Sequence, residues 1–224
     1  VPNDRLLHMF RVTAGLPSTA EPLGGWEAPD CELRGHFAGG HYLSACALMY
    51  SSTKNEALRS KANDLVTELI KCQKPNGYLG AYPEEFYDRL KAHQKVWAPF
   101  YTYHKIMAGL LDMYVHCGNE QALEASERMA DWADAWSSPM TEDEFQRVLR
   151  VEFGGMTEVS FNLYAVTGKE KYVTLARRFG KKSFFDPLAE RQDHLAGLHA
   201  NTHIPQVIGA ARGYELTGDN RYHT

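Results

Sequence analysis

The chain has 224 residues, of which 44% are hydrophobic and 23% charged, a balance typical of globular domains with a sizeable core. The formal net charge of −4 argues against nucleic-acid binding, which usually needs a basic face or stripe. No apolar run approaches the roughly 20 residues that span a bilayer, so we expect neither nucleic acid nor a membrane as a partner.

The first predicted hairpin lies at residues 41–72. The segment HYLSACALMY at 41–50 has helical apolar spacing, the polar turn SSTKN follows it, and a second helical pattern ends at Cys72. Just downstream, GYLGAY at 77–82 is the only short candidate for a strand. The chain is therefore predicted to be all-α.

Three later segments repeat at a fifty-residue step. They read YVHCG ending at Gly118, YAVTG ending at Gly168 and YELTG ending at Gly218. Each follows a helical apolar pattern, so each glycine is expected at a helix C-terminus in the left-handed conformation. A second helical pattern follows the first two glycines, at 123–136 and 172–179, which predicts αα-hairpins.

The hairpins are expected to close into a ring of inner and outer helices. Stacked hairpins form either an open α-solenoid or an (α/α) toroid. The first helices carry little charge, which suits an inner layer, and the second helices are regularly charged, which suits an outer layer. The segments that lead into the first helices are long, whereas scaffold repeats have short connections. An (α/α)6 toroid is therefore favoured.

The chain holds about three and a half hairpins of such a toroid. The last predicted inner helix, roughly 204–214, has its turn but no outer partner. We therefore expect residues 1–224 to be the N-terminal portion of a single larger toroid domain. The unpartnered helix is expected to expose apolar surface that a neighbour would cover.

Four polar and aromatic segments precede the inner helices and are expected to meet at one end of the ring. They lie at 33–45, 96–110, 151–159 and 198–206. A pocket of His, Trp, Tyr and Glu suits a neutral sugar, because apolar sugar faces pack on aromatic rings while imidazoles and carboxylates bond the hydroxyls.

The same segments carry a family resemblance. In order, the motifs are GHFAGGHYLSA, GYLGAYP, VWAPFYTYHKIMAGLLDMY, GGMTE and GLHANTHIPQVIGAARGYELTGD. They resemble the glycoside hydrolases of family 127 and its relative family 146, the β-L-arabinofuranosidase-like group, from about Asp4 to the last residue. The resemblance implies an (α/α)6 toroid followed by β-sandwich domains, and retaining cleavage of L-arabinofuranosides or related plant-type sugars.

The resemblance also implies a cysteine nucleophile, held on zinc with other Cys and Glu ligands, and a Glu acid/base. The family positions of all these groups lie beyond the YELTGD turn. We therefore expect no catalytic residue and no zinc ligand in these 224 residues. A chain of this extent is expected to be inactive without the remainder of its domain.

Two candidate sugar contacts come from the resemblance. His104 in YTYHK and His199 in GLHANT match histidines that contact substrate in the family. A third family histidine aligns near Phe153, where neighbouring Glu152 supplies the only polar group, and this departure leaves the sugar specificity open. The structural alternative for each histidine is a bond to a backbone carbonyl at a helix start.

Four further candidates come from residue chemistry. His36 and His41 flank the glycines of GHFAGGH and would present imidazoles to the pocket, although the glycines alone need only mark a tight turn. A zinc site on these two histidines lacks a third ligand at a recognisable spacing. Trp97 and Tyr101 would stack on a sugar ring, or else fill the core.

Two other functions stay open. One is a non-catalytic α-solenoid that binds proteins along a groove. The other is a toroid glycosidase or lyase that uses two ordinary carboxylates. The candidates for that pair are Glu84, Glu85 and Asp88, followed by Glu27 and Asp30, and their alternative role is that of solvated charges in loops and at helix starts.

The four cysteines are expected to be free. Cys31, Cys46, Cys72 and Cys117 are scattered and include no CxxC pair. In a chain with an adequate core, such cysteines usually act as small buried apolar side chains.

Overall fold

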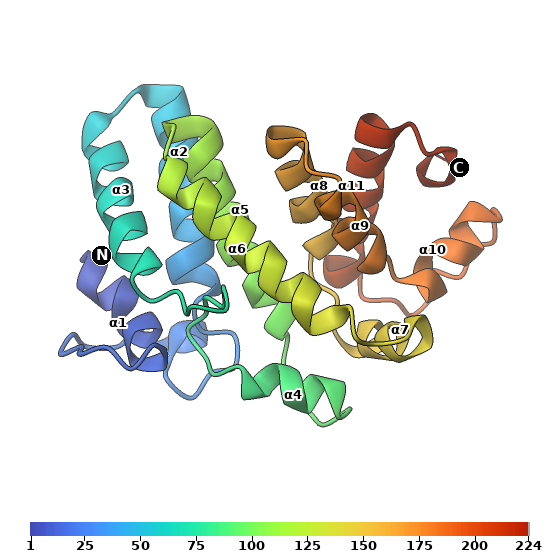
Figure 1. The fold of residues 1–224 in the computed structure, drawn as a ribbon, viewed down its shortest axis with the longest axis horizontal. Coiled ribbons are helices and arrows are strands. Elements are labelled where there is room, and N and C mark those ends of the chain that lie inside the picture. Colours follow the sequence, from blue (N-terminus) through green and yellow to red (C-terminus); the bar gives the residue numbers. More distant parts are fainter. Residues whose placement is uncertain (224) are drawn as a thin grey trace.

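A computed structural model describes residues 1–223, and the regular structure in that range is entirely helical (Figure 1). The α-helices are α1 (Asn3–Thr13), α2 (Tyr42–Thr53), α3 (Glu56–Ile70), α4 (Glu85–Lys91), α5 (Pro99–Cys117), α6 (Glu120–Ser137), α7 (Glu142–Val151), α8 (Met156–Thr167), α9 (Lys171–Arg178), α10 (Lys182–Ala189) and α11 (Ala200–Thr217). Three shorter helices are η1 (Gly25–Glu27), η2 (His36–His41) and η3 (Asn220–Tyr222). No described helix is both long and apolar enough to cross a membrane.

The long helices form two layers. In the inner layer α2 packs on α5, α5 on α8, and α8 on α11. In the outer layer α3 packs on α6 and α6 on α9, while α2–α3, α5–α6 and α8–α9 are the three hairpins (Figure 1). The predicted all-α arc of three and a half hairpins is confirmed.

The three repeated glycines end the inner helices as predicted. Gly118, Gly168 and Gly218 are the C-caps of α5, α8 and α11, with φ angles of 69°, 66° and 67°. A side chain would be strained in this left-handed conformation, so glycine fixes the point where each helix stops. The fifty-residue repeat therefore marks the ends of three inner helices, whereas α2 ends at Lys54, a non-glycine residue with a left-handed φ of 55°.

The candidate strand at 77–82 is not formed. The segment is an irregular buried stretch in which the Tyr78 hydroxyl donates to the Tyr82 carbonyl at 2.6 Å. The Tyr82 hydroxyl in turn donates to the carbonyl of Pro99 at 2.7 Å. Backbone carbonyls of the segment accept from elsewhere, since Tyr78 O accepts the Lys74 amide and Ala81 O accepts from the Arg34 side chain, so no strand ladder is needed.

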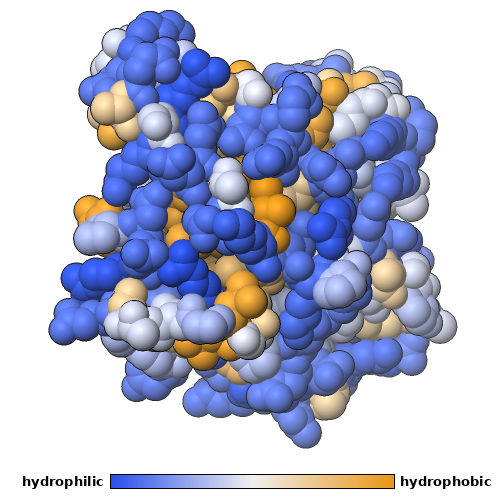
Figure 2. Space-filling model, turned by 60° about the vertical axis from the view of Figure 1, so that its left-hand side comes forward, coloured by the Kyte–Doolittle hydropathy of each residue, from blue (hydrophilic) through white to orange (hydrophobic). Residues whose placement is uncertain are grey.

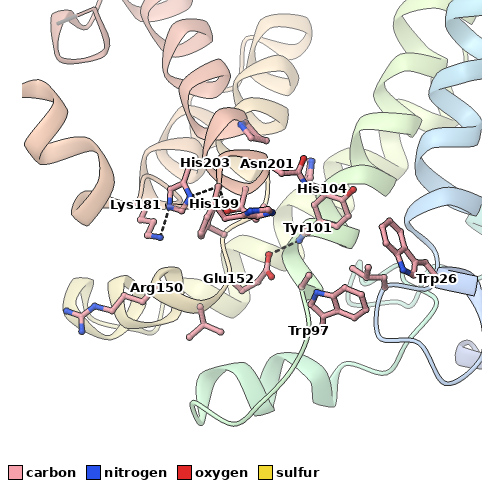
Figure 3. A pocket seen from close by; sticks show the side chains of 17 residues that line it. Trp26, Trp97, Tyr101, His104, Arg150, Glu152, Lys181, His199, Asn201 and His203 are labelled. Atoms are coloured by element: carbon pink, nitrogen blue, oxygen red, sulfur yellow. Dashed lines mark hydrogen bonds between the residues drawn. The ribbon is translucent and has the colours of Figure 1, made fainter. Parts of the chain in front are cut away.

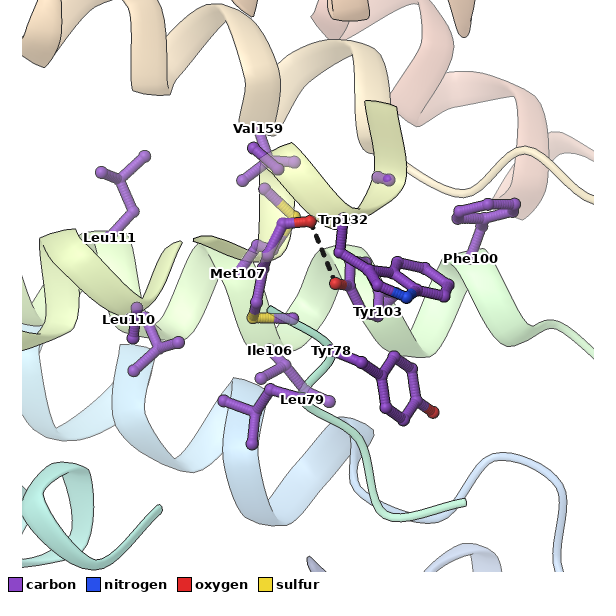
Figure 4. Packing of buried hydrophobic residues seen from close by; sticks show 14 of the residues in the cluster. Tyr78, Leu79, Phe100, Tyr103, Ile106, Met107, Leu110, Leu111, Trp132 and Val159 are labelled. Carbon is purple, nitrogen blue, oxygen red and sulfur yellow. Dashed lines mark hydrogen bonds between the residues drawn. The ribbon is translucent and has the colours of Figure 1, made fainter. Parts of the chain in front are cut away.

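An aromatic cluster fills the core between α5 and α6 (Figure 4). The ring of Tyr78 stacks on that of Tyr103 at 6.0 Å, and the Trp132 ring lies 4.9 Å from the first and 5.1 Å from the second. The Tyr103 hydroxyl donates to the Met129 carbonyl at 3.0 Å, so its polar end is satisfied. Each such buried aromatic stabilises the fold by about 1.5–3 kcal/mol.

The glycines of GHFAGGH do more than mark a turn. They lie in η2, a π-helix packed closely against α5. A Cβ on Gly40 would lie 2.7 Å from the Lys105 carbonyl carbon, and one on Gly109 would lie 2.6 Å from the Gly40 oxygen. Close approach of two backbones requires glycine on both sides, which fixes how η2 and α2 sit on α5.

The last inner helix exposes apolar side chains, as expected. On α11, Ile204 is 56% exposed, and Val207 and Ile208 are also exposed. By contrast, the face drawn in Figure 2 is mostly hydrophilic, with hydrophobic residues in small groups among polar ones. A run of exposed aliphatic residues on one helix is typical of a surface that packs against another element.

Candidate functional site

A cavity of about 460 Å³ opens where the segments before the inner helices meet (Figure 3). Each of the four predicted segments contributes to its wall. The lining residues are Trp26, Leu33, Trp97, Ala98, Tyr101, His104, Arg150, Val151, Glu152, Phe153, Gly154, Lys181, His199, Asn201, Thr202, His203 and Pro205. The convergence expected from the toroid is therefore present.

Five of the seven predicted site residues line this cavity, namely Trp97, Tyr101, His104, Glu152 and His199. His36 and His41 are not among the lining residues. Buried His36 lies behind the lining, with its ring 6.0 Å from that of Tyr101, and the His41 ring lies 5.8 Å from that of His36. These two histidines thus belong to the layer next to the cavity.

Buried Glu27 holds His36 and the start of η2 in place. Its carboxylate accepts the amide N–H groups of Gly35 at 2.7 Å and Phe37 at 2.8 Å. Nδ1 of His36 lies 2.9 Å from Oε1 of the same carboxylate and 2.8 Å from the Leu33 carbonyl. A carboxylate engaged in this way anchors the loop, so Glu27 is structural.

His104 is a neutral imidazole in the cavity wall. Burial and the nearby Lys105 lower the pKa of His104 to about 3. Nδ1 lies 3.3 Å from the Phe100 carbonyl, which only accepts hydrogen bonds, so Nδ1 carries the proton. Nε2 is then left as an acceptor and has no hydrogen-bond partner within residues 1–223. His104 therefore makes the bond to a backbone carbonyl that was its structural alternative, and it also keeps Nε2 as an acceptor for a ligand.

Glu152 joins two helices and reaches the cavity. Its Oε1 accepts the amide N–H of Tyr101, in the first turn of α5, at 2.9 Å. The side chain is 7% exposed, and this burial raises the pKa of Glu152 to about 8 although three backbone amides act in the opposite direction. Near neutral pH the carboxyl group is therefore protonated and can donate a hydrogen bond as well as accept one.

Two exposed tryptophans form one rim of the cavity. Trp97 is 50% exposed and Trp26 is 63% exposed, and their rings meet edge to face at 6.4 Å. The Trp97 amide donates to Glu32 at 2.6 Å, and the next residue, Ala98, adopts a left-handed φ of 53° before α5 begins. Trp26 was not predicted; its position after two glycines in a loop is the signal that could have identified it.

The opposite rim is basic and was also not predicted. The Nζ of Lys181 lies 3.0 Å from Nε2 of His203 and 4.4 Å from the centre of the Phe153 ring. Arg150, at the end of α7, lines the same region (Figure 3). In the sequence Lys181 lies in the short basic run ARRFGKK, which looks like ordinary charged surface.

The alternative of two ordinary carboxylates finds no pair in the cavity. Glu84 is engaged elsewhere, because it accepts bonds from Lys74 at 2.9 Å and from the Trp132 ring nitrogen at 3.0 Å. Glu85 and Asp88 lie in the first turn of α4. Among the described residues that line the cavity, Glu152 is the only acidic one.

The alternative of a protein-binding α-solenoid scaffold is not favoured either. The long connections before the inner helices build a pocket, which a bare scaffold repeat would lack.

The described residues do not fit a zinc–thiolate centre. Within residues 1–223, no group of three or more His, Cys, Asp or Glu side chains is arranged to hold a metal ion. All four cysteines are free; three are buried and Cys31 is half-buried. Burial raises the pKa of Cys72 to about 11, so that thiol stays protonated near neutral pH, as suits an apolar core residue.

Comparisons with known proteins agree with this architecture. Residues 1–224 match the family model described as "Beta-L-arabinofuranosidase, GH127 catalytic domain". The fold is similar to the crystal structure of Ara127N-Se, a GH127 β-L-arabinofuranosidase from Geobacillus stearothermophilus T6, with a TM-score of 0.66 and 19% identity over 98% of this chain and 37% of that one. It is also similar to the GH127 β-arabinofuranosidase BT3674, with a TM-score of 0.60 and 18% identity over 97% of this chain and 36% of that one.

No curated protein sequence matches the chain. The chain spans little more than a third of the length of these two solved structures. At such low identity the two structures establish the fold, and the family model establishes the relationship over the full sequence.

Proposed function

The chain belongs to the GH127 β-L-arabinofuranosidase catalytic-domain family, and from this premise we propose that it forms the sugar-binding part of a glycoside hydrolase. The substrates would be L-arabinofuranosides or related plant-type sugars, cleaved with retention. The observation that carries the proposal is the single cavity into which all four segments preceding the inner helices open.

The chemistry of the cavity supports a sugar ligand. Trp26 and Trp97 offer exposed aromatic faces on which the apolar side of a sugar ring packs. Nε2 of His104 accepts a hydrogen bond from a hydroxyl group, and the neutral carboxyl of Glu152 both donates and accepts. A small number of polar groups set in a largely apolar wall is typical of small-molecule sites.

In this proposal residues 1–224 are the N-terminal portion of a larger toroid. The exposed Ile204, Val207 and Ile208 on α11 would be covered by the next hairpins, and β-sandwich domains would follow the toroid. The zinc, the cysteine nucleophile and the Glu acid/base implied by the family resemblance would come from that remaining part. Residues 1–224 would then bind the sugar without cleaving it.

Calorimetry and an activity assay on the 224-residue chain test this proposal together. We expect saturable binding of methyl β-L-arabinofuranoside and no release of chromophore from an aryl β-L-arabinofuranoside. Hydrolysis by this chain that survives metal chelation would contradict the assignment of the catalytic groups to the remaining part. Absence of any binding to the sugar would contradict the assignment of the cavity.

A further inference from the structure

One end of the cavity carries two positive charges, and no carboxylate within residues 1–223 forms an ion pair with either of them. Lys181 is only 9% exposed, and the single hydrogen-bond partner of its ammonium group within residues 1–223 is His203. Arg150 is exposed and forms no ion pair within the same residues. Both line the cavity, although the whole chain has a net charge of −4.

The partner of Lys181 is a neutral imidazole. Nδ1 of His203 lies 3.1 Å from the His199 carbonyl, which only accepts, so Nδ1 carries the ring proton. Nε2 therefore accepts a hydrogen bond from the Lys181 ammonium at 3.0 Å and brings no negative charge. The face of Phe153 stabilises the cation further, yet two of the three ammonium hydrogens still lack a partner among the described residues.

This arrangement differs from that of the other strongly buried cation. Arg34 donates to the carbonyl of Ala81 at 2.7 Å and to that of Cys31 at 2.8 Å, which is the usual solution for a structural guanidinium. Lys181 instead reaches the wall of an open cavity with donors to spare. Burial lowers the pKa of Lys181, and a bound anion would offset that cost.

The basic end lies apart from the aromatic end. Figure 3 shows Lys181 and Arg150 on one side of Glu152, and Trp97 and Trp26 on the other. A ligand that occupies the whole cavity therefore meets aromatic faces at one end and two cations at the other. The cavity is large enough for such a ligand, because sites of about 300–1,000 Å³ hold drug-sized molecules.

We propose that Lys181 and Arg150 form a subsite for the carboxylate of an acidic, uronic-acid-type sugar residue in the substrate. The inference rests on the proposed function, since it assigns the acidic residue to the same saccharide whose neutral ring occupies the Trp26–Trp97 end. The Lys181 ammonium would donate charge-assisted hydrogen bonds to the carboxylate. Arg150, whose side chain points away from Lys181 and Glu152 in Figure 3, would add positive charge at the same end of the cavity.

The test compares an acidic sugar with its neutral counterpart on the 224-residue chain. Calorimetric titrations use methyl glucuronoside, methyl galacturonoside and the methyl ester of each, which removes the charge and keeps the ring. At least one free acid should bind about tenfold more tightly than its ester, the size expected of one charged hydrogen bond. Its affinity should fall as the ionic strength rises.

Variants locate the effect within the chain. Lys181→Met should remove most of the preference for the acid and Arg150→Met a smaller part of it, and both should lower the affinity for the acid much more than that for the ester. Lys181→Arg keeps the charge and should retain most of the preference. The matched controls are Lys182→Met, on the adjacent residue, and Arg147→Met, one turn earlier on α7; both should behave like the original chain. Thermal unfolding followed by circular dichroism verifies that every variant is folded.

Three other outcomes would contradict the proposed carboxylate subsite. Equal affinity for acid and ester, alongside binding of methyl β-L-arabinofuranoside, would overturn the subsite and leave the proposed function intact. Failure to bind any of these sugars would overturn both. If inorganic sulfate binds as tightly as the acidic sugars and is lost in the same variants, the site is a general anion site and the assignment to a sugar carboxylate is wrong.

Discussion

The backbone amide of Tyr101 donates a 2.9 Å hydrogen bond to the side chain of Glu152, fifty-one residues further along the chain. This bond ties the first turn of α5 to the end of α7, and therefore joins two of the segments that build the cavity. One buried side chain thus both positions the cavity wall and presents a polar group to the ligand.

The unusual protonation of Glu152 gives stability a distinct pH dependence. Because the folded-state pKa of about 8 lies above the ordinary value of 4.5, the unfolded chain releases this proton first as the pH rises. The associated stability is complete below about pH 4.5 and is lost as the pH rises through 8. Between pH 6 and 9 we expect a loss of about 2–3 kcal/mol in the free energy of unfolding from this group.

Glu152→Gln isolates that contribution, because glutamine keeps the oxygen that accepts the Tyr101 amide and cannot ionise. Urea unfolding at pH 6 and pH 9 should show a smaller pH dependence in the variant than in the original chain. If both chains lose stability equally between these two pH values, Glu152 is ionised throughout the range.

His104 should stay neutral across the physiological range. With its pKa lowered to about 3, the imidazole has no charge change between pH 5 and 8. Nitrogen chemical shifts of the ring should report the form protonated on Nδ1 at every pH in that interval. A titration of His104 near pH 6.5 would mean that the ring is solvated in place of being enclosed in the wall.

His104→Phe removes the acceptor at Nε2 and keeps much of the ring volume. We expect the affinity for methyl β-L-arabinofuranoside to fall by at least about tenfold, the value of one hydrogen bond to an otherwise buried group. His8→Phe is a suitable control, since His8 bonds Ser18 and does not line the cavity. An unchanged affinity in the His104 variant would remove it from the list of sugar contacts.

The two exposed tryptophans should matter for binding more than for folding. Trp97→Ala and Trp26→Ala should each weaken sugar binding by about 1–2 kcal/mol and change the free energy of unfolding by less than about 1 kcal/mol. Trp132→Ala provides the contrast, because that ring is buried in the core and its loss should cost about 3–5 kcal/mol of stability. Tryptophan fluorescence measures both quantities.

The contact between η2 and α5 should tolerate no side chain. Gly109→Ala would place a Cβ 2.6 Å from the Gly40 carbonyl oxygen, so the two helices must separate, at a cost of about 1–3 kcal/mol. Gly24→Ala meets nothing within 4 Å and should leave chemical denaturation unchanged. Equal midpoints for the two variants would contradict the close packing.

The features that could be predicted from the sequence are those that follow from periodic patterns. The repeated glycines marked the ends of α5, α8 and α11, because the left-handed C-cap selects glycine directly. The distribution of charged residues also separated inner from outer helices. The short helices α4, α7 and α10 and the first helix α1 were not identified, since their patterns are brief or lie inside connecting segments.

The cavity was predicted in part. His104 was identified from the family resemblance, and Glu152 lies in the connection before α8, one of the four segments expected to meet. Trp26 comes from η1 and Lys181 from the N-cap of α10, and only the tertiary fold brings them to the same cavity. Conversely, His36 and His41 were expected in the pocket, but neither is among the residues that line the cavity; they lie at the two ends of the π-helix η2.

The most direct test of the account is to map sugar binding onto the backbone amides of the 224-residue chain by NMR titration with methyl β-L-arabinofuranoside. The predicted result is a shared saturation curve for amides in 96–104, 151–155 and 199–203, three segments that line the cavity. Perturbations confined to one of these segments, or centred on the outer helices α3, α6 and α9, would contradict a common sugar pocket.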